Sequence, residues 1–167
     1  TPVSAQNQEK VVITLFWGNG CPHCAAERPF LATLQKKYPN LEVRTYEVWY
    51  IESNIPIMEK MAKAYGFEVS GVPITFLGDK NWVGFSDGLK KEIEDLVKTC
   101  SQKACKDPAK DVLTAEELAA GVPLELLPEE EAYKTGVTQS EATPESKSAS
   151  TIDVPLLGSI DLENQSL

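Results

Sequence analysis

The sequence predicts an α/β fold in which four strands alternate with three helices, followed by an acidic tail. Apolar, β-branched runs alternate with segments whose apolar residues recur at helical spacing over about the first hundred residues. Glycine and proline separate these segments. The length of 167 residues suits one domain with additional segments.

The first part of the domain is expected to run strand, helix, strand. Residues 11–17 form an almost unbroken apolar run, which is typical of a buried central strand. A helix is expected from Pro22, with a kink at Pro29 and an end before Pro39. The alternating residues 41–49 predict the second strand.

The second part is expected to run helix, strand, strand, helix. Residues 54–65 carry an apolar stripe at helical spacing. Residues 72–77 and 81–85 predict a hairpin, and residues 87–100 a last helix. The order is therefore β-α-β-α-β-β-α, with the strands in one central, mixed, four-stranded sheet.

Charge and composition divide the chain near Lys106. Residues 1–106 hold 13 basic and 12 acidic side chains, whereas residues 107–167 hold 3 and 13. The acidity therefore belongs to the last third of the chain. No basic cluster with interleaved aromatic residues is present, which argues against nucleic-acid binding. No apolar stretch approaches the 18 residues of a membrane-spanning helix.

Four segments are expected from these patterns. Residues 1–9 are a flexible N-terminus, and residues 10–106 are the folded domain. Residues 107–151 are rich in Pro, Glu, Ser, Thr and Ala, and are expected to be an acidic low-complexity linker. Within it, residues 114–117 match a capping box and could start one short helix. Residues 152–167 form a tail that turns apolar again.

The strongest chemical signal is Cys21-Pro22-His23-Cys24, placed between a buried strand and a helix. Helix N-termini carry partial positive charge and free N–H donors, which stabilise a thiolate at Cys21. Pro22 supports the first turn, and His23 adds further stabilisation of that thiolate. Cys24 lies one turn later on the same face and deeper. The pattern predicts attack by an exposed Cys21 and resolution by a buried Cys24.

The cysteines allow other interpretations. A zinc site could in principle be formed by Cys21, Cys24, Cys100 and Cys105. A Cys21–Cys24 disulfide could also be purely structural. The pattern favours neither interpretation over a redox dithiol, and no metal is expected. Cys100 and Cys105 are expected to form a structural disulfide at a helix end, with a second redox pair as the alternative. Two close pairs of cysteines suit an oxidising compartment.

Around this motif the chain resembles the thioredoxin-fold family over about residues 10–100. The residues that carry the likeness are Phe16-Trp17, the Cys-Pro-His-Cys motif and Gly71-Val72-Pro73. The resemblance implies thiol–disulfide exchange with protein substrates and no cofactor beyond the redox-active disulfide. It also implies that Pro73 is cis beside the dithiol and that Val72 lines the substrate groove. Trp17, nearest the dithiol, is expected in the core or lining that groove, and to report the redox state by fluorescence.

Two departures from the family pattern affect these expectations. Pro22-His23 resembles oxidising DsbA-type members, yet the 23 residues between Trp49 and Pro73 leave no room for their helical insertion. Many members also carry a buried acid six residues before the first cysteine, where this chain has Leu15. The possible proton acceptors for Cys24 are then Glu47 and Glu27.

Residues 152–162 resemble the segment that leads into the membrane domain of CcdA/DsbD-like electron transporters, proteins linked to cytochrome c biogenesis. That likeness implies an extracytoplasmic module, periplasmic or at the cell surface, tethered to a membrane electron-transfer domain of the same protein. It favours a reductase. A DsbA-like oxidase or isomerase, and a peptide-binding module with an idle dithiol, stay open as alternatives.

Overall fold

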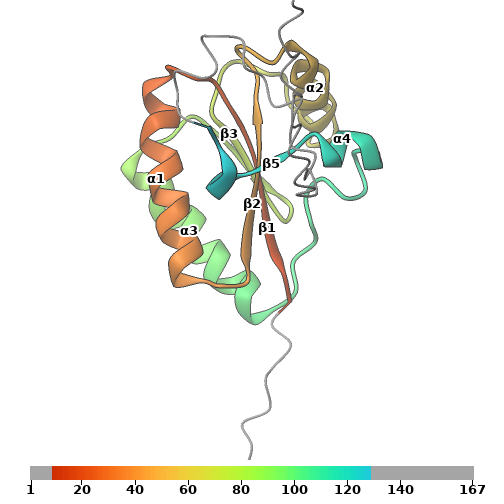
Figure 1. Ribbon diagram of the computed structural model, residues 1–167. Coiled ribbons are helices and arrows are strands. Elements are labelled where there is room, and N and C mark those ends of the chain that lie inside the picture. The colour runs from red at the N-terminus through yellow and green to blue at the C-terminus, as the bar shows by residue number, and fades with distance from the viewer. Residues whose placement is uncertain (1–8, 129–167) are drawn as a thin grey trace, which may run out of the picture.

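A five-stranded mixed sheet forms the centre of the molecule in the computed structural model, which describes residues 9–128. Its spatial order is β4 (Lys80–Val83), β3 (Ile74–Leu77), β1 (Val11–Trp17), β2 (Leu41–Glu47) and β5 (Val122–Pro123) (Figure 1). β2 runs parallel to β1, whereas β3 is antiparallel to β1, and the two edge strands are antiparallel to their neighbours. The predicted thioredoxin-like α/β fold is confirmed, and a fifth strand is added to it.

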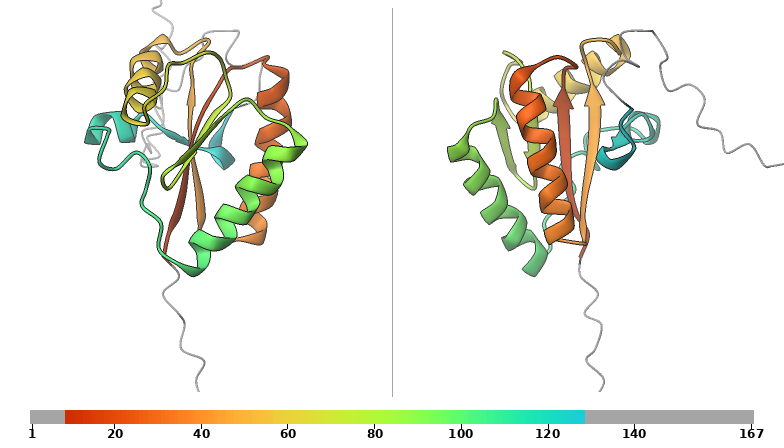
Figure 2. Two further views of the ribbon diagram at one scale, coloured as in Figure 1. Left: turned by 180° about the vertical axis from the view of Figure 1, so that it is seen from behind. Right: turned by 60° about the vertical axis from the view of Figure 1, so that its left-hand side comes forward.

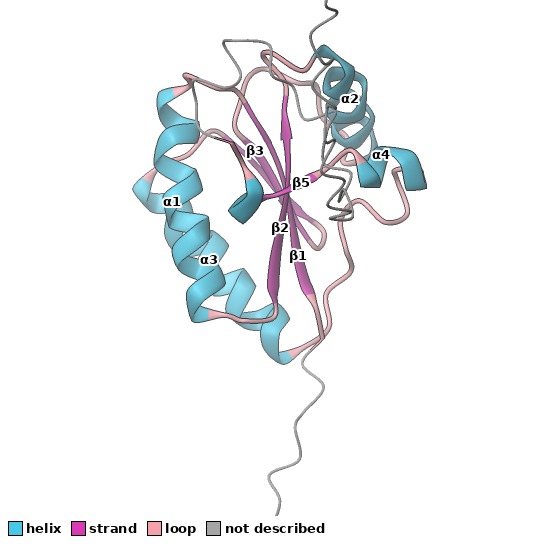
Figure 3. Cartoon of the chain, viewed as in Figure 1, coloured by secondary structure: helices cyan, strands magenta, loops and turns pink. Residues whose placement is uncertain are grey.

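Helices cover both faces of this sheet. α1 (Pro22–Lys37) and α3 (Asp87–Gln102) lie on one face, and α2 (Ile55–Ala64) and the short α4 (Ala115–Ala119) lie on the other (Figures 1 and 2). Two 3₁₀ turns, Glu52–Asn54 and Leu124–Leu126, complete the regular structure (Figure 3). In the described part of the chain, no helix is both long enough and apolar enough to cross a membrane.

The two faces explain why every residue of β1 except Thr14 is apolar. Alternate residues of a strand point to opposite sides of the sheet. Val11, Ile13, Leu15 and Trp17 belong to the core beneath α1 and α3. Phe16 belongs to the other core, where its ring stacks on Tyr46 at 4.9 Å between centroids. β1 is thus buried on both sides.

The linker prediction is wrong for residues 107–128, which belong to the folded domain. β5 pairs with the edge of β2, and Ala109, Leu113 and Leu124 are buried. The predicted capping box at Thr114 is confirmed at the start of α4. These elements are too short to give a periodic pattern, and they are ordered by the uncovered edge and face of the sheet. The remaining linker, the tail and residues 1–8 lie outside the described residues.

Polar contacts attach this C-terminal extension, residues 107–128, to β2. Arg44 donates two hydrogen bonds to Asp107, of 3.2 and 3.0 Å, and both side chains are largely buried. Burial alone would raise the pKa of Asp107, but Arg44 and the backbone N–H of Ala109 outweigh it and lower the pKa. The Tyr46 hydroxyl donates to the carbonyl of Glu117 at 2.9 Å. The extension is therefore tied down by directional bonds as well as by apolar packing.

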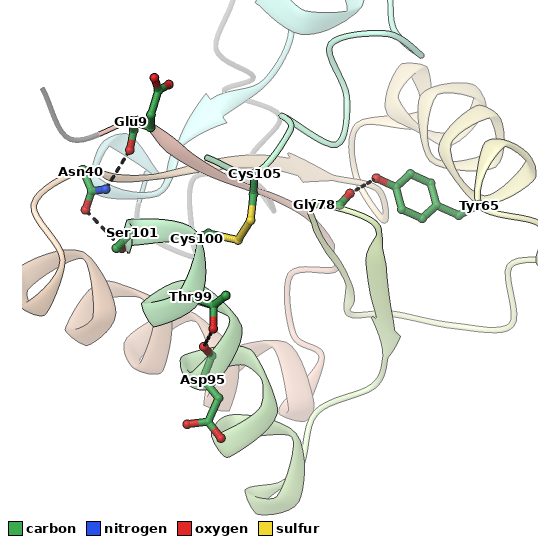
Figure 4. The surroundings of a disulfide bond; sticks show 9 residues. All are labelled: Glu9, Asn40, Tyr65, Gly78, Asp95, Thr99, Cys100, Ser101 and Cys105. Atoms are coloured by element: carbon green, nitrogen blue, oxygen red, sulfur yellow. Dashed lines mark hydrogen bonds between the residues drawn. A yellow bond between two sulfur atoms is a disulfide. The ribbon is translucent and has the colours of Figure 1, made fainter. Parts of the chain in front are cut away.

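A disulfide joins Cys100, near the end of α3, to Cys105, just before the extension begins (Figure 4). The predicted pairing of these cysteines is found. Close by, the Tyr65 hydroxyl donates to the carbonyl of Gly78 at 2.6 Å, in the turn between β3 and β4. The disulfide closes the loop where the chain leaves α3 and so fixes the starting point of the extension.

Candidate active site

The two free cysteines of the described chain lie where β1 ends and α1 begins. A tight turn connects the elements, and the N–H of Cys21 donates to the carbonyl of Gly18 at 3.1 Å. Cys21 is the N-cap of α1, and its Sγ accepts a hydrogen bond from the N–H of Cys24 at 3.3 Å. The helix N-terminus therefore directs a backbone donor at the Cys21 sulfur, as negative charge on that sulfur requires.

The two sulfurs differ in depth. Cys24 is fully buried, and Cys21 keeps 4% of its accessible surface, less than the exposed position expected from the sequence. The order of the two is as expected, with Cys21 at the edge of the site. Burial, followed by the hydrogen bond with Cys21, strongly raises the pKa of the Cys24 thiol. Cys24 therefore keeps its proton until a base removes it.

The segment before β3 closes the site from the other side. The thiol of Cys21 lies 3.6 Å from the carbonyl oxygen of Val72, 51 positions away in the sequence. The Val72–Pro73 peptide bond is cis, Pro73 is buried and Val72 is half-buried. The carbonyl of Pro73 accepts a hydrogen bond from Gly84 at 2.8 Å, which holds this segment to the hairpin.

Glu27 is a buried acid directly behind the dithiol. It follows Cys24 by one helical turn and has no exposed surface. Its Oε1 accepts a 2.6 Å hydrogen bond from the Thr75 hydroxyl, while its Oε2 is buried with no hydrogen-bond partner among the described residues. Burial raises the pKa of Glu27 to about 7, and Thr75 opposes the shift. The carboxyl group therefore exchanges its proton near neutral pH. Thr75 was not predicted to be a site residue. The one feature of the sequence that points to it is its place two residues after Pro73.

Glu47, the other possible proton acceptor, binds backbone N–H groups of two loops. Its Oε1 accepts from the backbone N–H groups of Asn19 and Trp49, at 2.9 and 3.0 Å. Its Oε2 accepts from those of Tyr50 and Ile51, at 2.8 and 3.0 Å. Four backbone N–H groups therefore occupy the two oxygens of the carboxylate. Through them, Glu47 joins the loop after β2 to the turn before Cys21.

The other predicted site residues surround this centre. Pro22 and His23 are exposed in the first turn of α1, and no hydrogen bond of His23 is found among the described residues. Trp17 is fully buried in the core that also contains Cys21 and Cys24. The Arg28 guanidinium lies 4.3 Å from the centre of the Trp17 ring. Trp17 is therefore placed to sense the dithiol from within the core.

The structure separates the two cysteine pairs chemically. Cys100 and Cys105 are bonded to each other, so they offer no thiolates to an ion beside Cys21 and Cys24. Within residues 9–128, no group of three or more His, Cys, Asp or Glu side chains is arranged to hold a metal. The chemistry available at the site is that of the dithiol with a buried carboxyl group.

Comparison with known proteins gives likeness in fold alone. No protein-family model matches the chain, and no curated protein sequence matches it. A Chlorobium tepidum protein assigned as thiol:disulfide interchange protein DsbE is 20% identical, with a TM-score of 0.43 over 55% of this chain and 80% of that one. Glutaredoxins from Archaeoglobus fulgidus and Francisella tularensis are each 20% identical, both with a TM-score of 0.39. These two matches cover 52% and 53% of this chain, and 85% and 98% of theirs. At these identities and TM-scores, the likeness carries no function over to this chain.

Proposed function

We propose that the chain is a thiol–disulfide oxidoreductase that exchanges disulfides with protein substrates through Cys21 and Cys24. One observation carries the proposal: a free, buried dithiol in which the first sulfur caps a helix and the second lies one turn behind it. A purely structural Cys21–Cys24 disulfide would need no base beside it. The buried carboxyl group of Glu27 can act as such a base, which favours a catalytic dithiol.

In the reducing direction the proposed reaction has two steps. The Cys21 thiolate attacks one sulfur of the substrate disulfide, a mixed disulfide forms, and the other substrate sulfur leaves as a thiolate. Glu27 then takes the proton of Cys24, and the Cys24 thiolate attacks the Cys21 sulfur. The second substrate sulfur leaves, so the substrate is reduced and Cys21–Cys24 becomes a disulfide. His23 and Pro22, exposed beside Cys21, face the incoming substrate.

The reducing direction and an extracytoplasmic location are part of the proposal. The likeness of residues 152–162 to the lead-in of a membrane electron transporter supports both. The Cys100–Cys105 disulfide fits an oxidising compartment. The electrons would then come from a membrane domain of the same protein. The Cys-Pro-His-Cys motif favours the reverse direction, that of an oxidase or isomerase, and one measurement separates the two.

The reduction potential of Cys21–Cys24 is expected to lie near about −270 mV, the value of thioredoxin. Trp17 fluorescence in dithiothreitol buffers of known ratio measures it, with Cys100 and Cys105 replaced by serine so that Cys21–Cys24 is the one pair that changes redox state. A value near about −120 mV, like that of DsbA, would identify an oxidase. Turnover of insulin disulfides with dithiothreitol as electron donor tests the class itself, since a peptide-binding module with an idle dithiol gives none.

Glu27→Gln is expected to slow the second step by about a hundredfold, the usual size of general-base catalysis. The rate at which Cys24 resolves a preformed mixed disulfide, measured by stopped-flow fluorescence, should rise in the wild type as pH passes about 7. Glutamine cannot take the proton, so this rise should disappear in the variant. A variant that keeps the wild-type pH profile would remove Glu27 from the mechanism.

The same substitution has a signature in stability that checks the pKa independently. The pKa of Glu27 is about 7 in the fold against an ordinary 4.5, so between these values the folded chain holds a proton that the unfolded chain releases. The free energy of unfolding should therefore fall by about 3 kcal/mol between pH 4.5 and pH 8 through this group. Urea unfolding at the two pH values should show this decrease in the wild type and lose it in Glu27→Gln.

A further inference from the structure

Two large aromatic side chains are exposed beside the candidate active site. Trp49 is 53% exposed and Tyr50 46% exposed, in the loop after β2. Among the described residues, Val83 and Leu126 are the only other large apolar side chains exposed to a similar degree. About half of the Trp49 side chain is therefore in contact with solvent.

The Trp49 ring lies against the turn that carries Cys21. A Cβ atom added to Gly18 would stand 2.3 Å from the ring, so the ring rests on the Gly18 backbone. The carbonyl of the same residue accepts the N–H of Cys21. Gly20 lies between Gly18 and Cys21 in the sequence. It has a φ of +92°, and a Cβ atom added to it would meet no atom within 4 Å. Nothing therefore obstructs the space beside Gly20, and its neighbour Asn19 is buried.

The aromatic pair is held in place before any ligand arrives. The Glu47 carboxylate accepts the backbone N–H groups of Trp49 and Tyr50, and it also accepts the N–H of Asn19 in the Cys21 turn. The carbonyl of Glu47 accepts from the Asn54 side chain at 2.8 Å. A buried carboxylate thus fixes the loop to the turn. Groups that are already ordered lose less conformational entropy on binding, so their apolar contact contributes more to affinity.

We propose that Trp49 and Tyr50 bind apolar side chains next to the reactive cysteine of a protein substrate. This inference rests on the proposed function and names its substrate class: polypeptide disulfides with apolar flanking residues. The occupant follows from position, because a polypeptide that brings its disulfide to Cys21 comes next to the Trp49 ring, which rests on Gly18 of the same turn. Glu47 acts as a positioning residue for the pair.

The test compares two synthetic peptide disulfides of equal length, one with leucines and one with serines flanking each cysteine. Bis(2-hydroxyethyl) disulfide serves as the substrate without flanks. The wild type should reduce the leucine peptide with a kcat/KM about tenfold above that of the serine peptide. Trp49→Ala and Tyr50→Ala should reduce this ratio towards one, mainly through KM.

Two further variants sharpen the test. Gly18→Ala displaces the Trp49 ring without removing it, so it should also reduce the preference for leucine. Leu126→Ala is the matched control, since it removes a side chain that is 67% exposed in another part of the surface and should leave the ratio unchanged. Urea unfolding of each variant shows that it is folded.

The outcomes separate this inference from the proposed function. Equal wild-type rates for the two peptides, or an unchanged preference in Trp49→Ala, would overturn the inference while turnover of bis(2-hydroxyethyl) disulfide upholds the function. No turnover of any disulfide by the wild type would overturn both. A dimer that Trp49→Ala dissociates would assign the aromatic pair to a second copy of the chain, which also overturns the inference.

Discussion

Cys21→Ser is expected to abolish the reduction of a protein disulfide, with a loss of at least about a thousandfold. The hydroxyl that replaces the thiol is not a nucleophile towards disulfides at neutral pH, and it leaves the buried Cys24 as the sole remaining thiol. Burial strongly raises the pKa of Cys24, so it cannot substitute for the missing sulfur. Insulin turnover with dithiothreitol measures the loss.

Cys24→Ser is the matched variant, because it changes the same atom one turn further along α1. It should still attack the substrate through Cys21, but the mixed disulfide then has no resolving thiol and accumulates. Non-reducing electrophoresis and intact mass should show this adduct in Cys24→Ser and none in Cys21→Ser. Full insulin turnover in Cys21→Ser would remove Cys21 from the reaction and overturn its assignment as the nucleophile.

Ending the chain after Lys106 is expected to destabilise the domain by roughly 4–6 kcal/mol. This truncation removes Leu113 and Leu124 from the core, at about 1.5–3 kcal/mol for each buried side chain. It also removes the two hydrogen bonds between Arg44 and Asp107. Native domains are stable by only about 5–15 kcal/mol, so much of the stability should be lost. Urea unfolding followed by Trp17 fluorescence measures the difference.

A chain that ends after Pro128 is the control for this truncation. It keeps β5, α4 and the contacts of the extension, so it should unfold at a higher urea concentration than the chain that ends after Lys106. If the chains ending after Lys106 and after Pro128 were equally stable, the extension would contribute nothing to the core. The prediction that the linker begins at residue 107 would then be correct.

The sequence determined the features whose cause is local. The almost unbroken apolar run of β1 specifies a strand buried on both faces, and the stripe on α2 specifies an amphipathic helix, because the spacing of apolar residues decides which sides of an element are buried. The position of Cys21 at a helix start follows in the same way from a strand, two glycines and Pro22. These local signals were sufficient for the order β-α-β-α-β-β-α and for the two cysteines of the site.

Tertiary structure decided what depends on partners distant in the sequence. Glu27 and Glu47 are the same residue type, and nothing local distinguishes them. Glu27 became a buried acid because apolar packing and Thr75 surround it, whereas Glu47 became a clamp because four backbone N–H groups converge on it. β5 likewise exists only because the edge of β2 offers unpaired backbone groups. The sequence by itself therefore determined the elements and the dithiol, while the pKa of the acid and the limits of the domain were decided by which groups the fold brought together.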